Sequence, residues 1–424
     1  MRRTTLPWLI LAIATVCVGT APAFAQESSP RILFGAFPPH GENLVAPRPA
    51  AGGAAAATTL PMWNFTTTAS RDGHDYHGTM IGRSPFFHGA RTTGIDVVLI
   101  PLRISIRNAN RFTEAFDPTQ TDGCLPSVPN ETATALSLTQ ESPVLMQANV
   151  AMNGVDESGM QYVDAFRRAN FFSLVNTTGD RYHTVLNVTK VAALSPVTTQ
   201  TFNDPQGAIV KSNCASKDIG VIDFFSFDSK IQSSILPALV AKGVVTSTVL
   251  PVFLLYNVVM TTDLPNQQNP LGFNCCTLGY HSGKGSLPNV QFYAVADFYS
   301  GGTFGGASNS PIDVYVLSHE IAELLDDPLV QNAGSGAGLG TPAWGHVGQD
   351  AQDCQTWLEV ADPLSSAISP RFFLPPLPMP NGVTYHPAEL AFFSWFYGAP
   401  SIGAGGSFSN DGTFTTDAGA ICSP

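Results

Sequence analysis

The chain has 424 residues, with 32 acidic side chains against 20 Lys and Arg, and its formal net charge at pH 7 is −12. Only 12% of the residues are charged, about half of the usual share, so much of the surface must consist of uncharged side chains. Because there is no basic patch, nucleic acids and anionic membranes are not expected partners. The length is sufficient for one large domain or two of medium size.

The first residues have the pattern of a secretory signal peptide. Arg2 and Arg3 precede an apolar stretch, and Ala23-Phe24-Ala25 forms a small-x-small cleavage site. We therefore predict that residues 1–25 are a signal peptide and that the mature protein is secreted or periplasmic. Residues 26–61 are rich in Pro, Ala and Gly, which predicts a leader or linker. No later stretch is long and apolar enough to predict a membrane span.

Residues 62–424 are predicted to form a single domain. Runs of β-branched and aromatic residues predict strands, and apolar residues at helical spacing predict helices. In the amphipathic helix expected at 161–172, Arg167 and Arg168 fall on the face assigned to solvent, with contact to an acidic substrate group as the alternative. In chain order we expect a strand at 95–106, this helix, strands at 183–194 and 219–225, a helix at 227–242, strands at 249–260 and 290–298, and, within the C-terminal part (about 370–424), an aromatic helix at 385–397 and a hairpin at 407–422.

Six of the seven cysteines remain after removal of the predicted signal peptide. An even number of cysteines in an exported chain predicts disulfides, here up to three. Two of the cysteines are adjacent, and we expect them to bond to different partners. The pairing is otherwise open among Cys124, Cys214, Cys275, Cys276, Cys354 and Cys422.

Residues 310–328 predict a buried helix with recognisable ends. Ser310 is a candidate N-cap, Pro311 suits the first helical position, and Asp313 can complete a capping box. Pro328 cannot continue the hydrogen-bond ladder and is expected to end the helix. Because most positions between these residues are apolar, we expect the helix to be buried on nearly all sides.

Three ionisable residues interrupt this apolar helix: His319, Glu320 and Glu323. His319 and Glu323 are four residues apart and therefore lie on one face. Burying an imidazole and two carboxylates is costly unless a cation meets them, so we predict a divalent metal site. The His-Glu-x-x-Glu pattern resembles the His-Glu-x-x-His helix of zinc metallopeptidases. The resemblance implies that His319 and Glu323 bind the metal and that Glu320 acts on a metal-bound water.

Later residues supply candidates for a third ligand. In gluzincin peptidases this ligand is a Glu, and an acid about one turn further on braces the metal-binding His. Glu359 and Asp362 resemble that pair, which implies that Glu359 binds the metal and Asp362 supports His319. His346 is the alternative ligand. His281 is expected either to stabilise a transition state near the metal or to be a hydrogen-bonded loop residue.

The order of these elements resembles that of zincin catalytic domains. The resemblance implies an α+β fold in which a twisted mixed sheet packs on a buried metal-binding helix, with disulfide-stapled loops around it. Ser318-His-Glu-Ile-Ala-Glu323, followed by Asp327-Pro328 and later by Leu358-Glu-Val-Ala-Asp362, is similar to secreted bacterial proteins with a zincin-like core. The same pattern is similar to that of the plant phosphate-induced, or EXORDIUM, family.

We therefore predict a secreted metal-dependent hydrolase, similar to a metallopeptidase, that acts on a peptide or another extracellular substrate. Zn²⁺ is the expected cofactor. Because Glu323 stands where the peptidases have His, the site carries additional negative charge, which makes Mn²⁺ or Ca²⁺ competitive. The alternative is an extracellular binding or signalling protein on a zincin-like scaffold that no longer turns over a substrate.

Overall fold

The computed structural model describes residues 33–36, 59–87, 90–108, 110–129, 131–177, 180–191, 199–212, 214, 216–263, 275–285, 287, 289–300, 313–330, 340–345, 354–365 and 375–417. The predicted signal peptide at 1–25 lies outside these ranges, as do His346 and Cys422.

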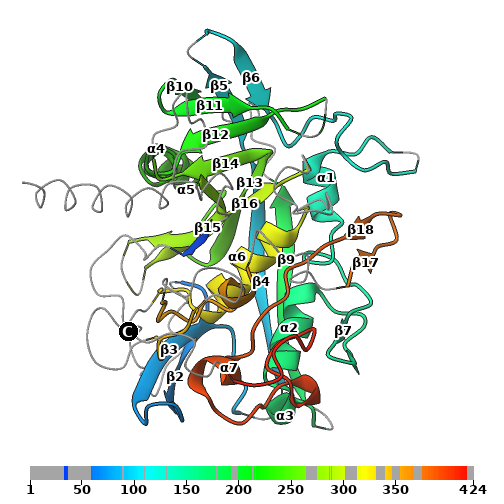
Figure 1. Cartoon of the computed structure of the whole chain (residues 1–424), viewed down its shortest axis with the longest axis vertical. Helices are drawn as coiled ribbons and strands as arrows, with labels where there is room; N and C mark the ends of the chain where they lie inside the picture. The colour runs from blue at the N-terminus through cyan, green and yellow to red at the C-terminus, as the bar shows by residue number, and fades with distance from the viewer. Residues whose placement is uncertain are drawn as a thin grey trace, which may run out of the picture.

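A mixed sheet of nine strands, counted over the described residues, forms the centre of the molecule (Figure 1). In spatial order the strands are β11 (Gly207–Val210), β12 (Ile219–Asp223), β14 (Val258–Thr261), β15 (Cys275–Lys284), β16 (Gln291–Phe298), β13 (Val249–Tyr256), β4 (Ala90–Pro101) and β9 (Arg181–Val191), and β1 (Leu33–Ala36) pairs with β15 outside this path. The strands from β16 to β9 pair in parallel, whereas β14 and β16 pair with β15 antiparallel.

Helices cover both faces of the sheet because side chains in its strands alternate between two apolar cores. In β13, Val252 and Leu254 belong to one core, and Phe253 and Leu255 belong to the other. The first core includes α2 (Tyr162–Asn170) and α6 (Tyr315–Asp326), and the second is covered by α4 (Phe224–Lys230), a π-helical turn (Ile231–Ile235) and α5 (Leu236–Ala241). The predicted α+β class with a large mixed sheet is thereby confirmed.

Shorter elements surround this centre. They are the hairpin β2 (Met62–Thr68) and β3 (Asp75–Ile81), the small sheet of β5 (Arg103–Arg107), β6 (Thr113–Phe116) and β10 (Thr199–Asn203), the pairs β7 (Ala151–Met152) with β8 (Val155–Asp156) and β17 (Leu377–Pro378) with β18 (Thr384–Tyr385), and the helices α1 (Ala135–Gln140), α3 (Phe172–Val175) and α7 (Phe393–Tyr397).

Two of the predicted strands are each divided in the structure. The run predicted at 95–106 leaves the main sheet after Pro101 and continues as β5. The run predicted at 249–260 is interrupted at Asn257, which has a φ of 52°, a conformation that Asn tolerates better than β-branched residues. The Asn257 Oδ1 accepts the backbone N–H of Ser300 at 2.8 Å. Apolar patterning does not detect either break, because both flanking segments remain apolar.

The helix predicted at 310–328 is shorter than expected and corresponds to α6. Asp313 lies before α6, which begins at Tyr315, and its Oδ1 accepts the backbone N–H groups of Val314 and His386. Its Oδ2 lies 3.0 Å from the His386 ring, and Ser310 lies outside the described residues. A contact with the C-terminal part of the chain therefore uses the side chain that the local pattern assigned to capping.

The C-terminal segment differs from its prediction in extent. The aromatic helix expected at 385–397 is confined to α7, which ends at Tyr397 and is capped by Gly398 in the left-handed conformation. The hairpin expected at 407–422 is a tight turn in its described part, closed by a hydrogen bond from the Phe408 N–H to the Phe414 carbonyl. Trp395 stacks on Phe414 with ring centroids 4.7 Å apart, so this aromatic segment belongs to the core.

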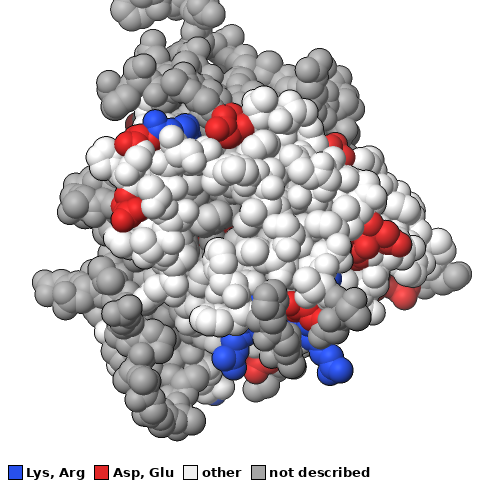
Figure 2. Space-filling model, turned by 90° about the horizontal axis from the view of Figure 1, so that it is seen from below, with Lys and Arg blue, Asp and Glu red and all other residues white. Residues whose placement is uncertain are grey.

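A disulfide joins Cys124 to Cys214 across 90 residues of sequence, which confirms that a disulfide staples a loop of this chain. Cys276 and Cys354 are disulfide-bonded as well. That Cys275 and Cys276 form disulfides with different cysteines stays a prediction. Within the described ranges, no helix has the length and apolarity needed to cross a membrane. Figure 2 shows a face on which charged side chains are sparse, in keeping with the composition.

Part of the segment predicted as a leader belongs to the sheet. Residues 33–36 form β1, which pairs in parallel with β15 and is the dark blue arrow beside it in Figure 1. Tyr280 and His281 of β15 pair with β1 and also with β16. Because a strand has only two edges, β1 must occupy the edge of β15 that β16 leaves open.

Candidate metal centre

Helix α6 approaches β15 closely at Gly279. A Cβ atom at this position would lie 2.4 Å from Cγ1 of Val316 and 2.8 Å from Cγ of Glu320, which is well inside van der Waals contact. The glycines around His281 suggested a loop, but Gly279 lies in a strand and allows the helix to pack against it. The close approach places the Glu320 side chain directly beneath β15.

A bulge in β15 turns His281 toward α6. Leu278 packs in the core on the α6 side, so strict alternation would point His281 to the opposite face. Between Thr277 and Tyr280, however, three residue steps of β15 match two of β1, as expected for an inserted residue. Tyr280 consequently packs in the second core, and His281 contacts α6. Of the two alternatives expected for His281, the loop position is thus wrong, because His281 lies in β15.

The first group of potential ligands consists of His319, Glu323 and Asp362. The His319 Nε2 lies 3.1 Å from Oε2 of Glu323 and 3.3 Å from Oδ1 of Asp362. The other oxygen of Glu323 accepts the backbone N–H groups of Ala361 and Asp362 at 3.1 and 3.2 Å. These bonds tie the α6 carboxylate to the start of a short 3-10 helix, Asp362–Leu364.

The second group consists of His281, Glu323 and Glu359. The His281 Nε2 lies 4.0 Å from Oε1 of Glu359, and its Nδ1 lies 3.4 Å from Oε2 of Glu320. The ring is therefore held between a carboxylate on α6 and one from the segment that follows Cys354. Each of these side chains is 1% exposed or less.

All of the described residues predicted for the site lie in one buried region, but their grouping differs from the expected one. His319, Glu323 and Glu359 do not form a single group; Glu323 belongs to both groups, whereas His319 and Glu359 belong to one each. Asp362 was expected only to support His319, but its carboxylate is itself close enough to the other two members of its group to be a metal ligand. Glu320 is adjacent to His281.

The surroundings shift the pKa values of these side chains. Burial lowers the pKa of His281 to about 3, which keeps the imidazole neutral. Burial also opposes protonation of His319, but the carboxylates of Glu323 and Asp362 outweigh it and raise the pKa of His319 to about 10. Burial raises the pKa of Glu320 and Glu359 well above the ordinary value. A negative charge in the site is therefore strongly disfavoured unless a positive charge lies nearby.

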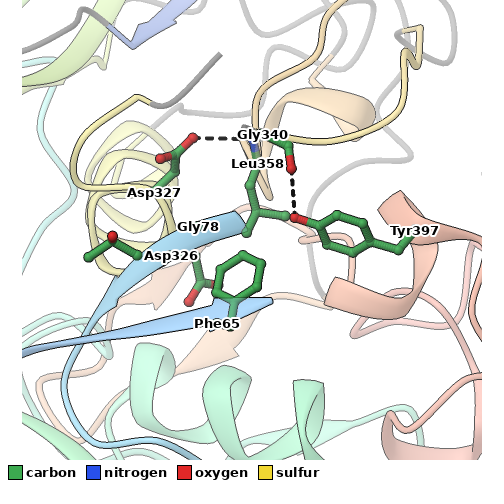
Figure 3. A pocket seen from close by; sticks show the side chains of 8 residues that line it. Phe65, Gly78, Asp326, Asp327, Gly340, Leu358 and Tyr397 are labelled. Carbon is green, nitrogen blue, oxygen red and sulfur yellow. Dashed lines mark hydrogen bonds between the residues drawn. The ribbon is translucent and has the colours of Figure 1, made fainter. Parts of the chain in front are cut away.

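The end of α6 is fixed by two contacts. Arg167 Nη1 lies 3.0 Å from Oδ1 of Asp326, and both side chains are buried. Arg167 was expected to face solvent; the correction follows from the acid at the helix C-terminus, which requires a cationic partner. Asp327 accepts the Leu358 N–H through Oδ2 at 3.3 Å, beside a hollow that Phe65 and Tyr397 also line (Figure 3).

The donor set and its spacing fit a divalent metal. Ligand atoms at about 2.0–2.2 Å from one tetrahedral zinc ion lie roughly 3.3–3.6 Å apart, close to the separations of 3.1 and 3.3 Å around His319. Among the described residues, neither carboxylate oxygen of Glu359 receives a hydrogen bond. Burying a carboxylate oxygen without a hydrogen bond is costly, and coordination to a metal ion would offset this cost.

Two contributors to the site were missed from the sequence. Gly279 allows the helix to approach, and Arg167 neutralises Asp326 at the end of that helix. The adjacent acids Asp326 and Asp327 at a helix C-terminus predicted a cap for the next turn, a structural cation or a partner Arg, but the sequence did not indicate which arginine. Gly279 gave no comparable signal, because a glycine in a strand and a glycine in a loop look alike in one sequence.

Comparison of the chain with protein-family models, with curated proteins and with solved structures finds no match.

Proposed function

We propose that this protein is an exported metal-dependent hydrolase that cleaves a peptide or another extracellular substrate. The observation that supports it is the buried cluster of two imidazoles and four carboxylates around Glu323. Such a cluster is costly without cations. The disulfide between Cys124 and Cys214 supports an oxidising compartment outside the cytoplasm.

In this proposal His319, Glu323 and Asp362, or His281, Glu323 and Glu359, hold a divalent cation. A bound cation would polarise a substrate carbonyl and make a water molecule more acidic. Zn²⁺ suits the mixed nitrogen and oxygen ligands, and the carboxylate-rich set also suits Mn²⁺ or Ca²⁺.

Glu320 is the proposed proton carrier. Its Oε2 lies 3.4 Å from Nδ1 of His281, it follows His319 in the chain, and its Oε1 accepts no hydrogen bond within the described residues. Burial raises its pKa well above the ordinary value, so the protonated form is accessible in the folded protein. The carboxylate form can accept a proton from the attacking water, and the carboxylic acid that results can return this proton to the leaving group.

The proposal includes a zincin-like scaffold. Helix α6, with its His-Glu-x-x-Glu residues, packs against β15 and β16 of the mixed sheet, and an acid-containing segment returns to it after Cys354. These features support a resemblance to zincin catalytic domains in how the helix, the sheet and the returning segment are arranged.

A second candidate function is favoured by the burial of the cluster. His281, His319, Glu320 and Glu359 are each 0% exposed, and Asp362 is 3% exposed. A metal enclosed to this degree can serve folding alone, and the protein would then be an extracellular binding or signalling protein without turnover.

The two functions are separated by assaying wild type, Glu320→Gln and Glu157→Gln on casein and on a peptide library, with metal content measured in parallel. Glu157 is a buried acid paired with Arg168 outside the cluster, so it controls for the loss of a buried charge. The hydrolase proposal predicts that Glu320→Gln retains metal and loses at least about a hundredfold of activity, as expected for a lost proton carrier, while Glu157→Gln remains active. Metal-loaded wild type without activity above that of Glu320→Gln would favour the second function.

A further inference from the structure

We propose that the cluster holds two divalent cations at once and that Glu323 bridges them. The two groups of ligands have only Glu323 in common. The other four members divide into two pairs, each with one imidazole and one carboxylate: His319 with Asp362, and His281 with Glu359. This inference goes beyond the proposed function in number of metal ions and in the role of Glu323, and it rests on the proposed metal centre but not on hydrolysis.

The separation of the groups argues for two positions. No described group of four potential ligands has all its ligand atoms within 4.8 Å of one another, whereas each group of three has. His319 and Glu359 fall in different groups, so one ion cannot reach all five residues. Two ions bridged by a carboxylate lie about 3.5–4 Å apart in two-metal sites, a spacing that a single Glu can span.

The charge of the cluster argues for two ions as well. Glu320, Glu323, Glu359 and Asp362 bring four carboxylates into a region that is almost free of solvent. The guanidinium of Arg167, next to this region, is already paired with Asp326 at 3.0 Å. When Glu323, Glu359 and Asp362 bind as ionised ligands and both imidazoles bind as neutral ones, one divalent ion leaves one negative charge unbalanced. Two ions balance all three ligand charges and that of Glu320 when it is ionised.

The ligand atoms are also oriented for such a centre. The backbone N–H groups of Ala361 and Asp362 fix one oxygen of Glu323, and a carboxylate offers about four lone-pair sites, enough for these bonds and two ions. Glu320 lies at Nδ1 of His281, which turns the Nε2 of that ring toward Glu359. A carboxylate behind a His ring is the usual support of a metal-binding imidazole. Both oxygens of Glu359 remain without a donor among the described residues.

The first test is the metal stoichiometry of the purified, exported full chain. The protein is stripped with a chelator and titrated with Zn²⁺ and separately with Mn²⁺, and bound metal is counted by calorimetry and elemental analysis. We expect two ions per chain for wild type. His281→Gln and Asp362→Asn should each retain one ion, and Glu323→Gln should weaken both. His183→Gln serves as the control, because His183 pairs with Asp164 away from the cluster and should leave two ions bound.

A second measurement needs no variant. Two Mn²⁺ ions bridged by a carboxylate are magnetically coupled, so saturated wild type should give an exchange-coupled electron paramagnetic resonance spectrum. An isolated Mn²⁺ signal at saturation, or one ion per chain that every ligand variant abolishes, would overturn the two-ion centre.

The outcomes also separate this inference from the proposed hydrolase. One ion with hydrolysis would overturn the two-ion centre alone, and two coupled ions without hydrolysis would support the centre while contradicting the hydrolase. Absence of any bound ion would overturn both.

Discussion

At the scale of single residues, the distance between α6 and β15 depends on the missing side chain of Gly279. We expect Gly279→Ala to lower the free energy of unfolding by about 1–3 kcal/mol, because the new methyl group would overlap Val316 and Glu320. Urea denaturation followed by circular dichroism measures this loss. Metal affinity should fall in the same variant, since Glu320 must move.

Gly94→Ala is the matched control for this substitution. Gly94 lies in β4 of the same sheet, and an added Cβ would meet the amide nitrogen of Asn187 at 2.8 Å, the end of an exposed side chain that can rotate. Equal destabilisation by both substitutions would contradict the role assigned to Gly279.

A second residue-scale prediction concerns Asp297, a fully buried acid in β16. Burial raises its pKa well above the ordinary value of 3.8, and one hydrogen bond, from the Val258 N–H at 3.0 Å, only partly opposes this. The neighbouring Tyr256 gives its hydroxyl to Asp122 and not to Asp297. The folded protein therefore prefers Asp297 protonated.

The contribution of Asp297 to the free energy of unfolding depends on pH. The stabilising contribution of protonated Asp297 is complete below pH 3.8 and is lost as the pH rises through the raised folded-state pKa. Asp297→Asn retains the acceptor for Val258 without the charge. We expect the variant to be at least as stable as wild type near neutral pH, and its unfolding free energy to fall less between about pH 4 and pH 8. Parallel pH profiles for the two proteins would contradict this assignment.

At the scale of secondary-structure elements, the contact between α2 and α6 depends on a buried ion pair. Arg167 also donates to the Leu325 carbonyl at 3.0 Å, so it binds the end of α6 twice. Removing only the guanidinium leaves Asp326 buried without its partner. We therefore expect Arg167→Met to lower the free energy of unfolding by about 3–5 kcal/mol.

A double-mutant cycle with Asp326→Leu tests this prediction. Replacement of both partners by apolar residues is expected to recover most of the loss, because no unpaired charge is left. Arg168→Met is the control: this neighbouring arginine pairs with Glu157 and is more exposed, so its loss should cost less. Additive effects of the two single substitutions would show that the pair does not couple the helices.

At the scale of the whole molecule, β1 joins the beginning of the chain to the strand that carries His281. A protein beginning at Thr59 lacks β1 and leaves the edge of β15 open. We expect its unfolding free energy to be lower by about 1–3 kcal/mol, the scale of a few net hydrogen bonds, and its tendency to self-associate to rise, because open edges invite pairing. Calorimetry and light scattering measure the two effects.

The control for the truncation keeps the chain length and replaces Leu33–Ala36 by Gly-Ser-Gly-Ser. Loss of stability and increased association should be similar in both proteins if β1 pairing is responsible. A stable, monomeric truncation would contradict this role of β1.

Some helices of the molecule can be predicted from the sequence, whereas the surroundings of individual residues cannot. The helix with His319, Glu320 and Glu323 is recognisable because apolar residues surround three ionisable ones at helical spacing. The helix at 161–172 is found for a similar reason, since α2 follows an amphipathic repeat. Yet Arg167 on that helix looks like a surface residue until the position of Asp326 is known.

The sequence by itself determined the strands with dense apolar runs and the chemistry of the residues around Glu323, because periodicity and side-chain type are local properties; the α+β class was what the resemblance to zincin domains implied. Only the tertiary structure decided which carboxylate meets which imidazole. That choice depends on a bulge in β15, on the contact distance at Gly279 and on a segment that returns after Cys354. Each of these brings together residues far apart in the chain, and no pattern within one segment records such a contact.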